Sequence, residues 1–255
     1  MFLNGWTEDV LKHSKTTNMQ NINGKTALIT GGSKGIGLGI AQSMLDQGMK
    51  VMITGRTESA LQDAKNQLIT RDKENILTYV SDVRDPNSLQ SAVDKLLREW
   101  GVLDVLIANA GVGHFAPIDE LSMEEWQETI DINLSGVFYT LKSGMKALKS
   151  SQGYFITVAS LAGTNFFANG AAYNASKFGL VGFTQAVMLD LRKYGIKVST
   201  IMPGSVATHF ADHVPSEKDN WKIQPEDIGQ MVIDLLQMHP RTLPSKIEVR
   251  PSMPG

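Results

Sequence analysis

The sequence predicts an α/β fold: a doubly wound parallel sheet of about seven strands, with helices on both faces, in a single domain. Short apolar runs rich in β-formers alternate with segments of helical spacing along the chain. The runs are apolar throughout rather than alternating, as in strands that are buried on both faces. A length of 255 residues, with 42% hydrophobic and 20% charged residues, suits one large domain.

Seven runs predict the strands in chain order, at 26–30, 50–54, 75–80, 103–108, 153–159, 197–202 and 246–249. Helical spacing lies between them, roughly at 36–47, 57–69, 86–100, 122–149, 173–194 and 225–238. Gly48, Gly101 and Gly195 follow three of these helices, where a left-handed residue ends a helix. Pro86 and Pro225 stand in the first turns of two others.

The ends and the overall charge limit the class of protein. Residues 1–22 form a polar N-terminal extension without the apolar stretch of a secretory signal, and the expected domain covers 23–255. The extension is either a short segment that packs on a neighbour or the product of a start upstream of Met19. A net charge of −2 indicates neither nucleic acid nor a membrane surface as a partner. The lack of cysteine is compatible with a cytoplasmic protein and excludes thiolate metal sites.

A glycine-rich turn joins the first predicted strand to the first helix. Residues 30–39 read TGGSKGIGLG, with the spacing G-x-x-x-G-x-G at Gly31, Gly35 and Gly37. Such a turn lets backbone amides approach a phosphate at a helix N-terminus. Many tight turns need glycine for backbone reasons alone, but the position after the first strand favours a dinucleotide site.

The residues after the second strand indicate which nicotinamide cofactor is preferred. A carboxylate at this point would bind the ribose hydroxyls of NAD, but the chain has Gly55 and Arg56. Arg56 and Lys34 would clamp a 2′-phosphate, or else both are solvated surface cations. We therefore expect NADP(H) as the preferred cofactor, with NAD(H) as the alternative, and no metal.

A tyrosine and a lysine one helical turn apart suggest acid–base chemistry. Tyr173 and Lys177 would leave the same face of a helix, and Ser160 precedes them by thirteen residues. A nearby ammonium is expected to lower the tyrosine pKa toward the range that a proton-transfer group needs. The pair alone is weak evidence, because such spacing is common on solvated helices.

Together these motifs resemble the short-chain dehydrogenase/reductase family, in its compact single-domain form, over residues 24 to about 238. The resemblance rests on the glycine turn, Asp82-Val83, Asn109-Ala110-Gly111, Asn133, Ser160, Tyr173-x-x-x-Lys177 and Pro203-Gly204, in family order. Within this family, the chain is similar to members that reduce carbonyl compounds or 3-oxoacyl-carrier-protein substrates. The resemblance implies a Rossmann fold and a small carbonyl or alcohol as substrate.

The family resemblance also assigns roles to residues. Tyr173 would be the general acid in reduction, and Lys177 would hold the nicotinamide ribose. Ser160 would hydrogen-bond the substrate oxygen, and Asn133 would hold a water that links Lys177 to solvent. Asn133 is otherwise a polar residue that bends its helix. The expected cofactor-binding set is Gly31, Ser33, Lys34, Gly35, Ile36, Gly37, Arg56, Asp82, Val83, Asn109, Ala110, Gly111, Tyr173, Lys177, Pro203, Gly204, Val206 and Thr208.

Some segments differ from what the family usually has. The substrate loop, about 205–223, is short and favours an open pocket or a small, extended substrate. Several aromatic side chains and one histidine either border that pocket or belong to the core or a subunit contact: Phe115, Phe166, Phe167, His209, Phe210 and Trp221. The C-terminal segment lacks a glycine-rich tail, which argues against a role in fatty-acid synthesis. Apolar runs in 122–149 and 173–194 allow a homodimer or homotetramer.

The function expected from the sequence is reduction of a ketone, aldehyde or 3-oxoacyl group by NADPH, with tyrosine as the acid. An alcohol dehydrogenase that works in the oxidative direction is the main alternative. A nucleotide-sensing protein without catalysis is the other, although such proteins often lose the tyrosine or the lysine, and both are present here.

Overall fold

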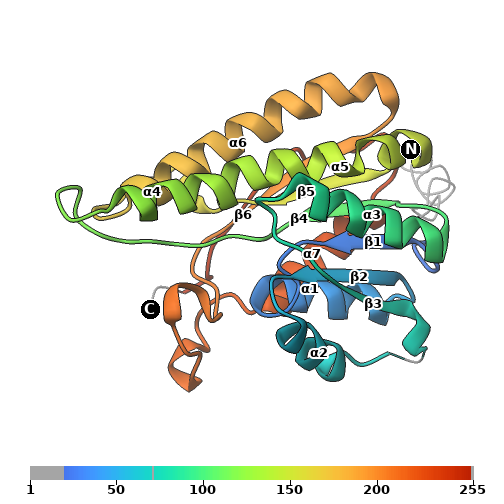
Figure 1. Cartoon of the computed structure of the whole chain (residues 1–255), viewed down its shortest axis with the longest axis horizontal. Coiled ribbons are helices and arrows are strands. Elements are labelled where there is room, and N and C mark those ends of the chain that lie inside the picture. Colours follow the sequence, from blue (N-terminus) through green and yellow to red (C-terminus); the bar gives the residue numbers. More distant parts are fainter. Residues whose placement is uncertain (1–19, 71, 254–255) are drawn as a thin grey trace, which may run out of the picture.

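The computed structural model describes residues 20–70 and 72–253 (Figure 1). Most of the expected N-terminal extension, residues 1–19, lies outside this described part. Its last residues already belong to the domain, because Gln20 donates its amide to the carbonyl of Gln237 at 3.1 Å. Ile22 is only 3% exposed and packs in the core.

Seven parallel strands form one sheet in the order β3-β2-β1-β4-β5-β6-β7. Their bounds are β1 Thr26–Ile29, β2 Lys50–Gly55, β3 Ile76–Val80, β4 Val105–Ala108, β5 Tyr154–Val158, β6 Lys197–Pro203 and β7 Lys246–Val249. The strand order reverses between β1 and β4, which pair directly. The doubly wound parallel sheet predicted from the sequence is confirmed.

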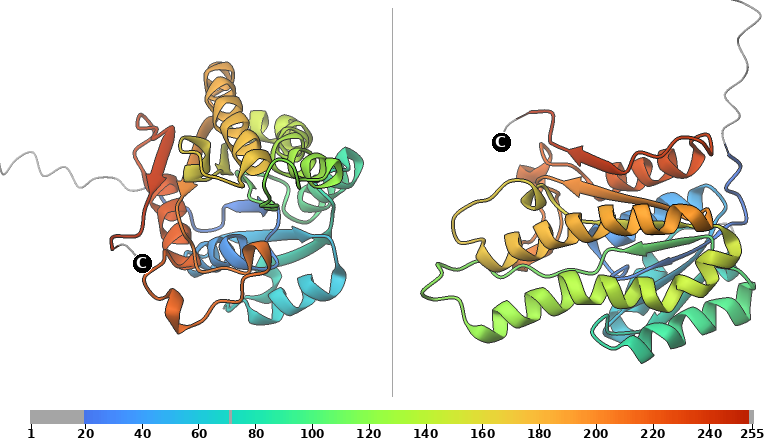
Figure 2. Two further views of the ribbon diagram at one scale, coloured as in Figure 1. Left: turned by 90° about the vertical axis from the view of Figure 1, so that its left-hand side faces the viewer. Right: turned by 90° about the horizontal axis from the view of Figure 1, so that it is seen from above.

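Helices cover both faces of the sheet (Figures 1 and 2). One face carries α1 Gly35–Asp46, α2 Glu58–Gln67 and α7 Pro225–Gln237. The other carries α3 Pro86–Trp100, α5 Gly136–Ser151 and α6 Ala171–Leu191. The short helix α4 Met123–Ile130 precedes α5 and runs beside α6. Because both faces are covered, strands such as β1 and β5 are buried along their whole length.

The predicted helix ends have a physical basis in the structure. Gly48, Gly101 and Gly195 have φ values of 74°, 78° and 73°, the left-handed conformation that glycine adopts without strain. At the start of α3, the Asp85 side chain accepts a hydrogen bond from the amide of Asn87 at 2.9 Å, and proline takes the first turn. The sequence therefore placed these helix ends correctly.

The predicted single helix over 122–149 is interrupted. A π-helical turn, Asp131–Ser135, separates α4 from α5, although the backbone stays helical on both sides. Helix α6 begins at Ala171, two residues before the predicted start, and β4 begins at Val105 rather than at 103. Within residues 20–70 and 72–253, none of the helices is both long and apolar enough to cross a bilayer.

Candidate active site

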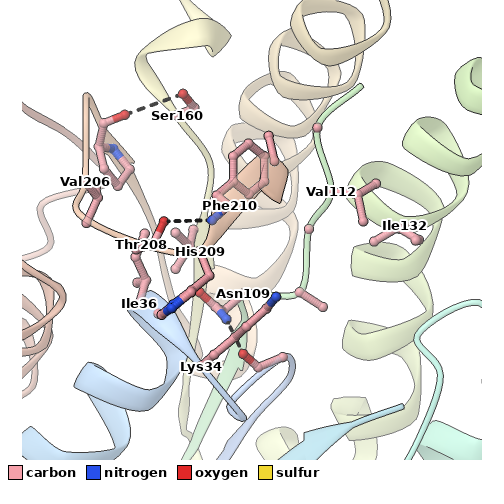
Figure 3. Close-up of a pocket in the computed structure, with 18 of the residues that line it drawn as sticks. Lys34, Ile36, Asn109, Val112, Ile132, Ser160, Val206, Thr208, His209 and Phe210 are labelled. Atoms are coloured by element: carbon pink, nitrogen blue, oxygen red, sulfur yellow. Dashed lines mark hydrogen bonds between the residues drawn. The ribbon is translucent and has the colours of Figure 1, made fainter. Parts of the chain in front are cut away.

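A cleft of about 740 Å³ lies at the carboxyl ends of the strands, where the order of the sheet reverses between β1 and β4. Almost all the predicted site residues line it, from the glycine turn to Tyr173 and Lys177. Figure 3 shows Thr208 close to Ile36, and Val112 and Ile132 on the side of the cleft opposite Ser160 and Val206. Gly37 and Asn133 do not line the cleft, so their contributions are indirect.

The glycine turn needs its glycines for close contacts. Gly31 has a φ of 64°, and a Cβ there would lie 2.8 Å from the Cα of Ala110. A Cβ on Gly37 would lie 2.5 Å from the carbonyl oxygen of Gly31 and 2.6 Å from the Asn109 side chain. Lys34, at the N-cap of α1, gives no side-chain cap, and the first turn has no acidic residue. The helix N-terminus thus offers amides and positive partial charge to the cleft, and this fits a pyrophosphate.

Asn109 ties the ends of β1 and β4 together at the floor of the cleft. Its side-chain amide donates to the carbonyls of Thr30 and Gly31, both at 3.0 Å. Its backbone amide donates to the Thr30 hydroxyl at 3.1 Å. Asn109 therefore has a structural role, and it also lines the cleft.

Arg56 and Lys34 are exposed cations on the rim of the cleft. Nη1 of Arg56 lies 3.9 Å from Oε1 of Glu128, and Arg84 approaches the same carboxylate at 4.0 Å. Arg84 also holds Asp82 through hydrogen bonds from its guanidinium, and these lower the pKa of the Asp82 carboxyl. Near the end of β2, Arg56 and Arg84 thus lie close to the carboxylates of Asp82 and Glu128.

Tyr173 and Lys177 lie one turn apart on α6, as predicted, and Lys177 points its Nζ to 5.6 Å from the centre of the Tyr173 ring. Lys177 is only 4% exposed, and its Nζ donates to the carbonyl of Val158 at 3.2 Å. Burial lowers the pKa of Lys177 to about 8. Burial also raises the pKa of the Tyr173 phenol to about 12, and a hydrogen bond with Ser160 opposes that rise.

The net shift of the Tyr173 pKa is therefore upward, opposite to the lowering that the sequence predicted from the nearby ammonium. Desolvation of the phenol outweighs the stabilisation of the phenolate. At neutral pH, Tyr173 is therefore a protonated phenol and a proton donor. Lys177 remains mostly protonated at neutral pH, since its pKa of about 8 is above 7.

Ser160 lies at the end of β5 and begins a short turn, Leu161–Gly163. Its hydroxyl accepts from the amide of Ala162 at 3.1 Å and donates to the carbonyl of Pro203 at 3.4 Å (Figure 3). The second bond is long, so the hydroxyl proton is held weakly. That proton is free to turn toward an oxygen placed in the cleft.

Asn133 is fully buried in the π-helical turn and clamps the chain after β4. Its side chain accepts from the amide of Val112 at 2.9 Å and donates to the carbonyl of Val112 at 2.9 Å. It also donates to the Ser176 hydroxyl at 3.1 Å. Asn133 thus connects the loop after β4 to α6, close to Lys177.

The segment after β6 forms a loop closed at its base. Val206 pairs with Ile223, and the amide of Ala207 donates to the Ile223 carbonyl at 2.9 Å. Inside the loop, the nearly buried Asp219 accepts from Lys222 at 2.6 Å, from the amide of Ser216 at 2.9 Å and from His213 at 2.9 Å. These bonds, Lys222 first among them, lower the pKa of Asp219. Contacts within the substrate loop, centred on Asp219, therefore stabilise its conformation.

The aromatic residues expected near the cleft divide into two groups. Phe115 contacts both Phe167 and Phe210, and Phe115 and Phe210 also contact the Tyr173 ring. Phe166 is 86% exposed, and Trp221 lies beside Lys222 on the loop. Phe210 and His209 also line the cleft.

Several cleft residues were not predicted from the sequence. They are Gly55, Ser81, Val112, Gly113, His114, Glu128, Ile132, Val158, Ala159, Ser205, Ala211, His213 and Lys222. Most contribute through position in the fold, and no local pattern marks them. For Glu128 the sequence gives only its place on a helix: the capping box of Ser122 and Glu125 marks the start of α4, and Glu128 lies one turn after Glu125.

The sequence model of a family described as short chain dehydrogenase matches residues 25–219 of this chain. An uncharacterised oxidoreductase of Staphylococcus saprophyticus is 32% identical over 238 residues, which cover 91% of this chain and 100% of the relative.

Two solved structures are similar over almost the whole domain. One is an alcohol dehydrogenase of the archaeon Thermococcus sibiricus with 5-hydroxy-NADP, with a TM-score of 0.83, 27% identity, and 89% and 97% of the two chains covered. The other is a 3-ketoacyl-(acyl-carrier-protein) reductase of Brucella melitensis with NADH, with a TM-score of 0.82, 23% identity, and 91% and 98% covered. The latter likeness concerns the fold alone.

Proposed function

Because this chain belongs to the short-chain dehydrogenase family, we propose that it is an NADPH-dependent reductase of a ketone, an aldehyde or a 3-oxoacyl group. One observation carries the proposal: Ser160, Tyr173 and Lys177 meet in the same cleft as the glycine turn at the N-terminus of α1. The chain is thus an oxidoreductase with a nicotinamide cofactor, and its substrate and direction are what we propose.

Tyr173 is the proton donor in this mechanism. The nicotinamide cofactor supplies the hydride that reduces the carbonyl carbon. The phenol, whose pKa burial raises to about 12, gives its proton to the carbonyl oxygen as negative charge develops there. Ser160 turns its weakly held proton to the same oxygen and stabilises that charge. Lys177 holds its ammonium behind the tyrosine ring, where a positive charge favours the phenolate that remains after proton transfer.

A substrate screen tests the activity. Purified protein is offered a panel of ketones, aldehydes and 3-oxoacyl thioesters, and the loss of NADPH and of NADH is followed by absorbance. The Tyr173→Phe variant is the matched control, because it differs from the wild type only by the loss of the phenol hydroxyl. We expect it to lose turnover by several orders of magnitude and to retain cofactor binding. An absence of turnover with every substrate and both cofactors would refute the proposal.

The two similar structures contain different cofactors, 5-hydroxy-NADP and NADH, and so do not indicate a preference. The proposed preference for NADPH therefore rests on Arg56 and Lys34 of this chain. Gly55 at the end of β2 provides no carboxylate to repel a 2′-phosphate. We expect Arg56→Ala to weaken NADPH binding by about 10-fold or more, the effect of losing a charge-assisted contact. NADH binding would stay the same, and Arg98→Ala, on the exposed surface of α3, would change neither. An equal loss for both cofactors would remove Arg56 from phosphate recognition.

An alcohol dehydrogenase acting in the oxidative direction is the second candidate, favoured by the name of the Thermococcus sibiricus protein. Measuring kcat/KM in both directions at pH 7 separates the two. The protonated phenol predicts that reduction is faster at neutral pH and that oxidation gains as the pH rises.

We also propose that the protein is a cytoplasmic homodimer or homotetramer that buries the outer surface of α5 and α6. Phe138 on α5 and Phe178 and Leu189 on α6 are 44%, 43% and 60% exposed. Large apolar side chains on one surface often mark a subunit contact. Sedimentation velocity of the wild type and of Phe138→Glu tests this, and a monomeric wild type would refute it.

A further inference from the structure

We propose that the carbonyl substrate carries a flat, uncharged aromatic ring, which binds against Phe115, Phe167 and Phe210 beside Tyr173. This inference rests on the proposed reductase function and specifies its substrate class. Hereafter these three residues are called the phenylalanine cluster.

The cluster gathers three loops around the catalytic tyrosine. Phe115 follows β4, Phe167 follows β5 and Phe210 follows β6. The ring centroid of Phe115 lies 5.4 Å from that of Tyr173, with an angle of 65° between the planes. The Phe210 ring lies 5.6 Å from Tyr173 and 6.3 Å from Phe115. These are the separations of edge-to-face aromatic pairs.

Gly113 shapes this cluster. A Cβ at this position would lie 2.6 Å from Cε1 of Phe210 and 2.9 Å from Cζ of Phe115. Two rings from separate loops therefore approach the same backbone, and a side chain at this position would have to displace them. Phe210 reaches this place from a backbone in which Ala211 has a φ of 51°, a conformation that residues other than glycine adopt rarely. Such local strain is typical of a position that contacts a ligand.

The cluster is open to an incoming group. Phe115 is 44% exposed and Phe167 is 48% exposed, although both touch other rings. Rings that served only the core would be covered, as Phe155 is. Phe210 lines the cleft, and Phe115 packs on both Phe210 and Tyr173, so a group bound against these rings lies next to the carbonyl that Tyr173 protonates.

The charges nearby favour an uncharged group. His114, next to Phe115 in the chain, contacts Glu128 at 2.9 Å. His213 and Lys222 on the substrate loop both contact Asp219. These three groups are already matched by carboxylates, and an acidic substituent gains little from them. A flat ring instead adds to the existing edge-to-face contacts, each of which contributes about 0.5–1.5 kcal/mol beyond the buried area.

Two ketones of similar size test the inference. Phenyl methyl ketone offers a flat ring, and cyclohexyl methyl ketone offers a saturated ring of the same carbon number. We expect the wild type to prefer the phenyl ketone by about 10-fold in kcat/KM, the sum of about two aromatic contacts. Comparing this ratio between the wild type and its variants cancels both the intrinsic reactivity of each ketone and any general effect on Tyr173, since both ketones need the same proton.

Three variants and one matched control complete the experiment. Phe115→Leu and Phe210→Leu keep an apolar side chain and remove the ring, and each is expected to lower the preference to about 3-fold, the share of the remaining contact. Gly113→Ala is expected to do the same, because its Cβ displaces the Phe210 ring. Phe166→Leu, on the same loop as Phe167 but 86% exposed, keeps the wild-type preference. Circular dichroism and cofactor binding confirm that each variant is folded.

The outcomes separate the two proposals. If the wild type reduces the cyclohexyl ketone as well as the phenyl ketone, the aromatic substrate class is refuted and the reductase remains. If the cluster variants keep the full preference, the cluster does not recognise the ring. If no carbonyl compound in the wider panel is reduced, the proposed function itself fails.

Discussion

The buried Asn133 clamp allows one quantitative prediction. Replacing Asn133 by alanine removes three hydrogen bonds, two of them to the backbone of Val112. The Ser176 hydroxyl keeps a partner, because it donates to the carbonyl of Tyr173 at 2.8 Å. The backbone amide and carbonyl of Val112 lose their hydrogen-bond partner, which is the fully buried side chain of Asn133.

The size of the effect follows from those two backbone groups. A buried polar group without a partner costs about 1–3 kcal/mol. Partial access of water to Val112, which is only half-buried, places the total near the lower part of the range. We therefore expect Asn133→Ala to lower the free energy of unfolding by about 2–4 kcal/mol, and the melting temperature by roughly 5–15 °C for a chain of this size.

Urea denaturation followed by circular dichroism measures this loss. Asn66→Ala is the matched control, because Asn66 is an exposed asparagine on α2 whose side chain accepts a hydrogen bond from the neighbouring Gln62 at 3.0 Å. It should stay within about 0.5 kcal/mol of the wild type. If Asn133→Ala were as stable as Asn66→Ala, the clamp would carry no stability. A loss of turnover in such a stable variant would instead support the water-holding role that the family resemblance implies.

Three further predictions concern the same cleft. Tyr173→Phe should reduce turnover by about 10²–10⁴-fold or more and leave the NADPH dissociation constant within about 2-fold, measured by steady-state kinetics and fluorescence titration; full activity would exclude Tyr173 as the acid. Gly37→Ala should abolish cofactor binding at micromolar NADPH, because its Cβ would lie 2.5 Å from the Gly31 carbonyl, and normal titration would contradict the turn geometry. Because burial lowers the Lys177 pKa to about 8, the folded protein binds this proton more weakly than the unfolded chain does. The contribution of Lys177 to stability is therefore full above about pH 10.5 and is lost as the pH falls through about 8. Relative to Lys177→Met, the unfolding free energy of the wild type should rise by about 2 kcal/mol between about pH 8 and 10 in urea titrations, and a flat difference would refute the burial argument.

The architecture was predictable because its signals are local. Each strand is a short apolar run, and Gly101 or Pro86 marks a helix end through its own backbone preference. The glycine turn is recognisable for the same reason, since its spacing reflects backbone contacts within one segment. The residues of the resemblance also meet in one cleft, although their spacing in the chain is large.

The features that sequence reasoning missed depend on contacts between distant segments. Phe115, Phe167 and Phe210 come from three loops, and nothing local shows that their rings meet. The sharing of Glu128 between Arg56 and Arg84 likewise appears only in space. The direction of the Tyr173 pKa shift was wrong because spacing reveals a neighbouring charge but not the degree of burial, and burial dominates here.

The π-helical turn Asp131–Ser135 also sets the phase between two helices. A π-turn holds one residue more than an α-turn, and one residue rotates an α-helix by about 100°. Deleting a single residue from this segment would let a regular helix run through from α4 to α5. It would also turn α4 about its axis, so that a different side of α4 would meet α6. The length of this segment therefore matters as well as the identity of Asn133, because a change of one residue would alter the side of α4 that packs on α6.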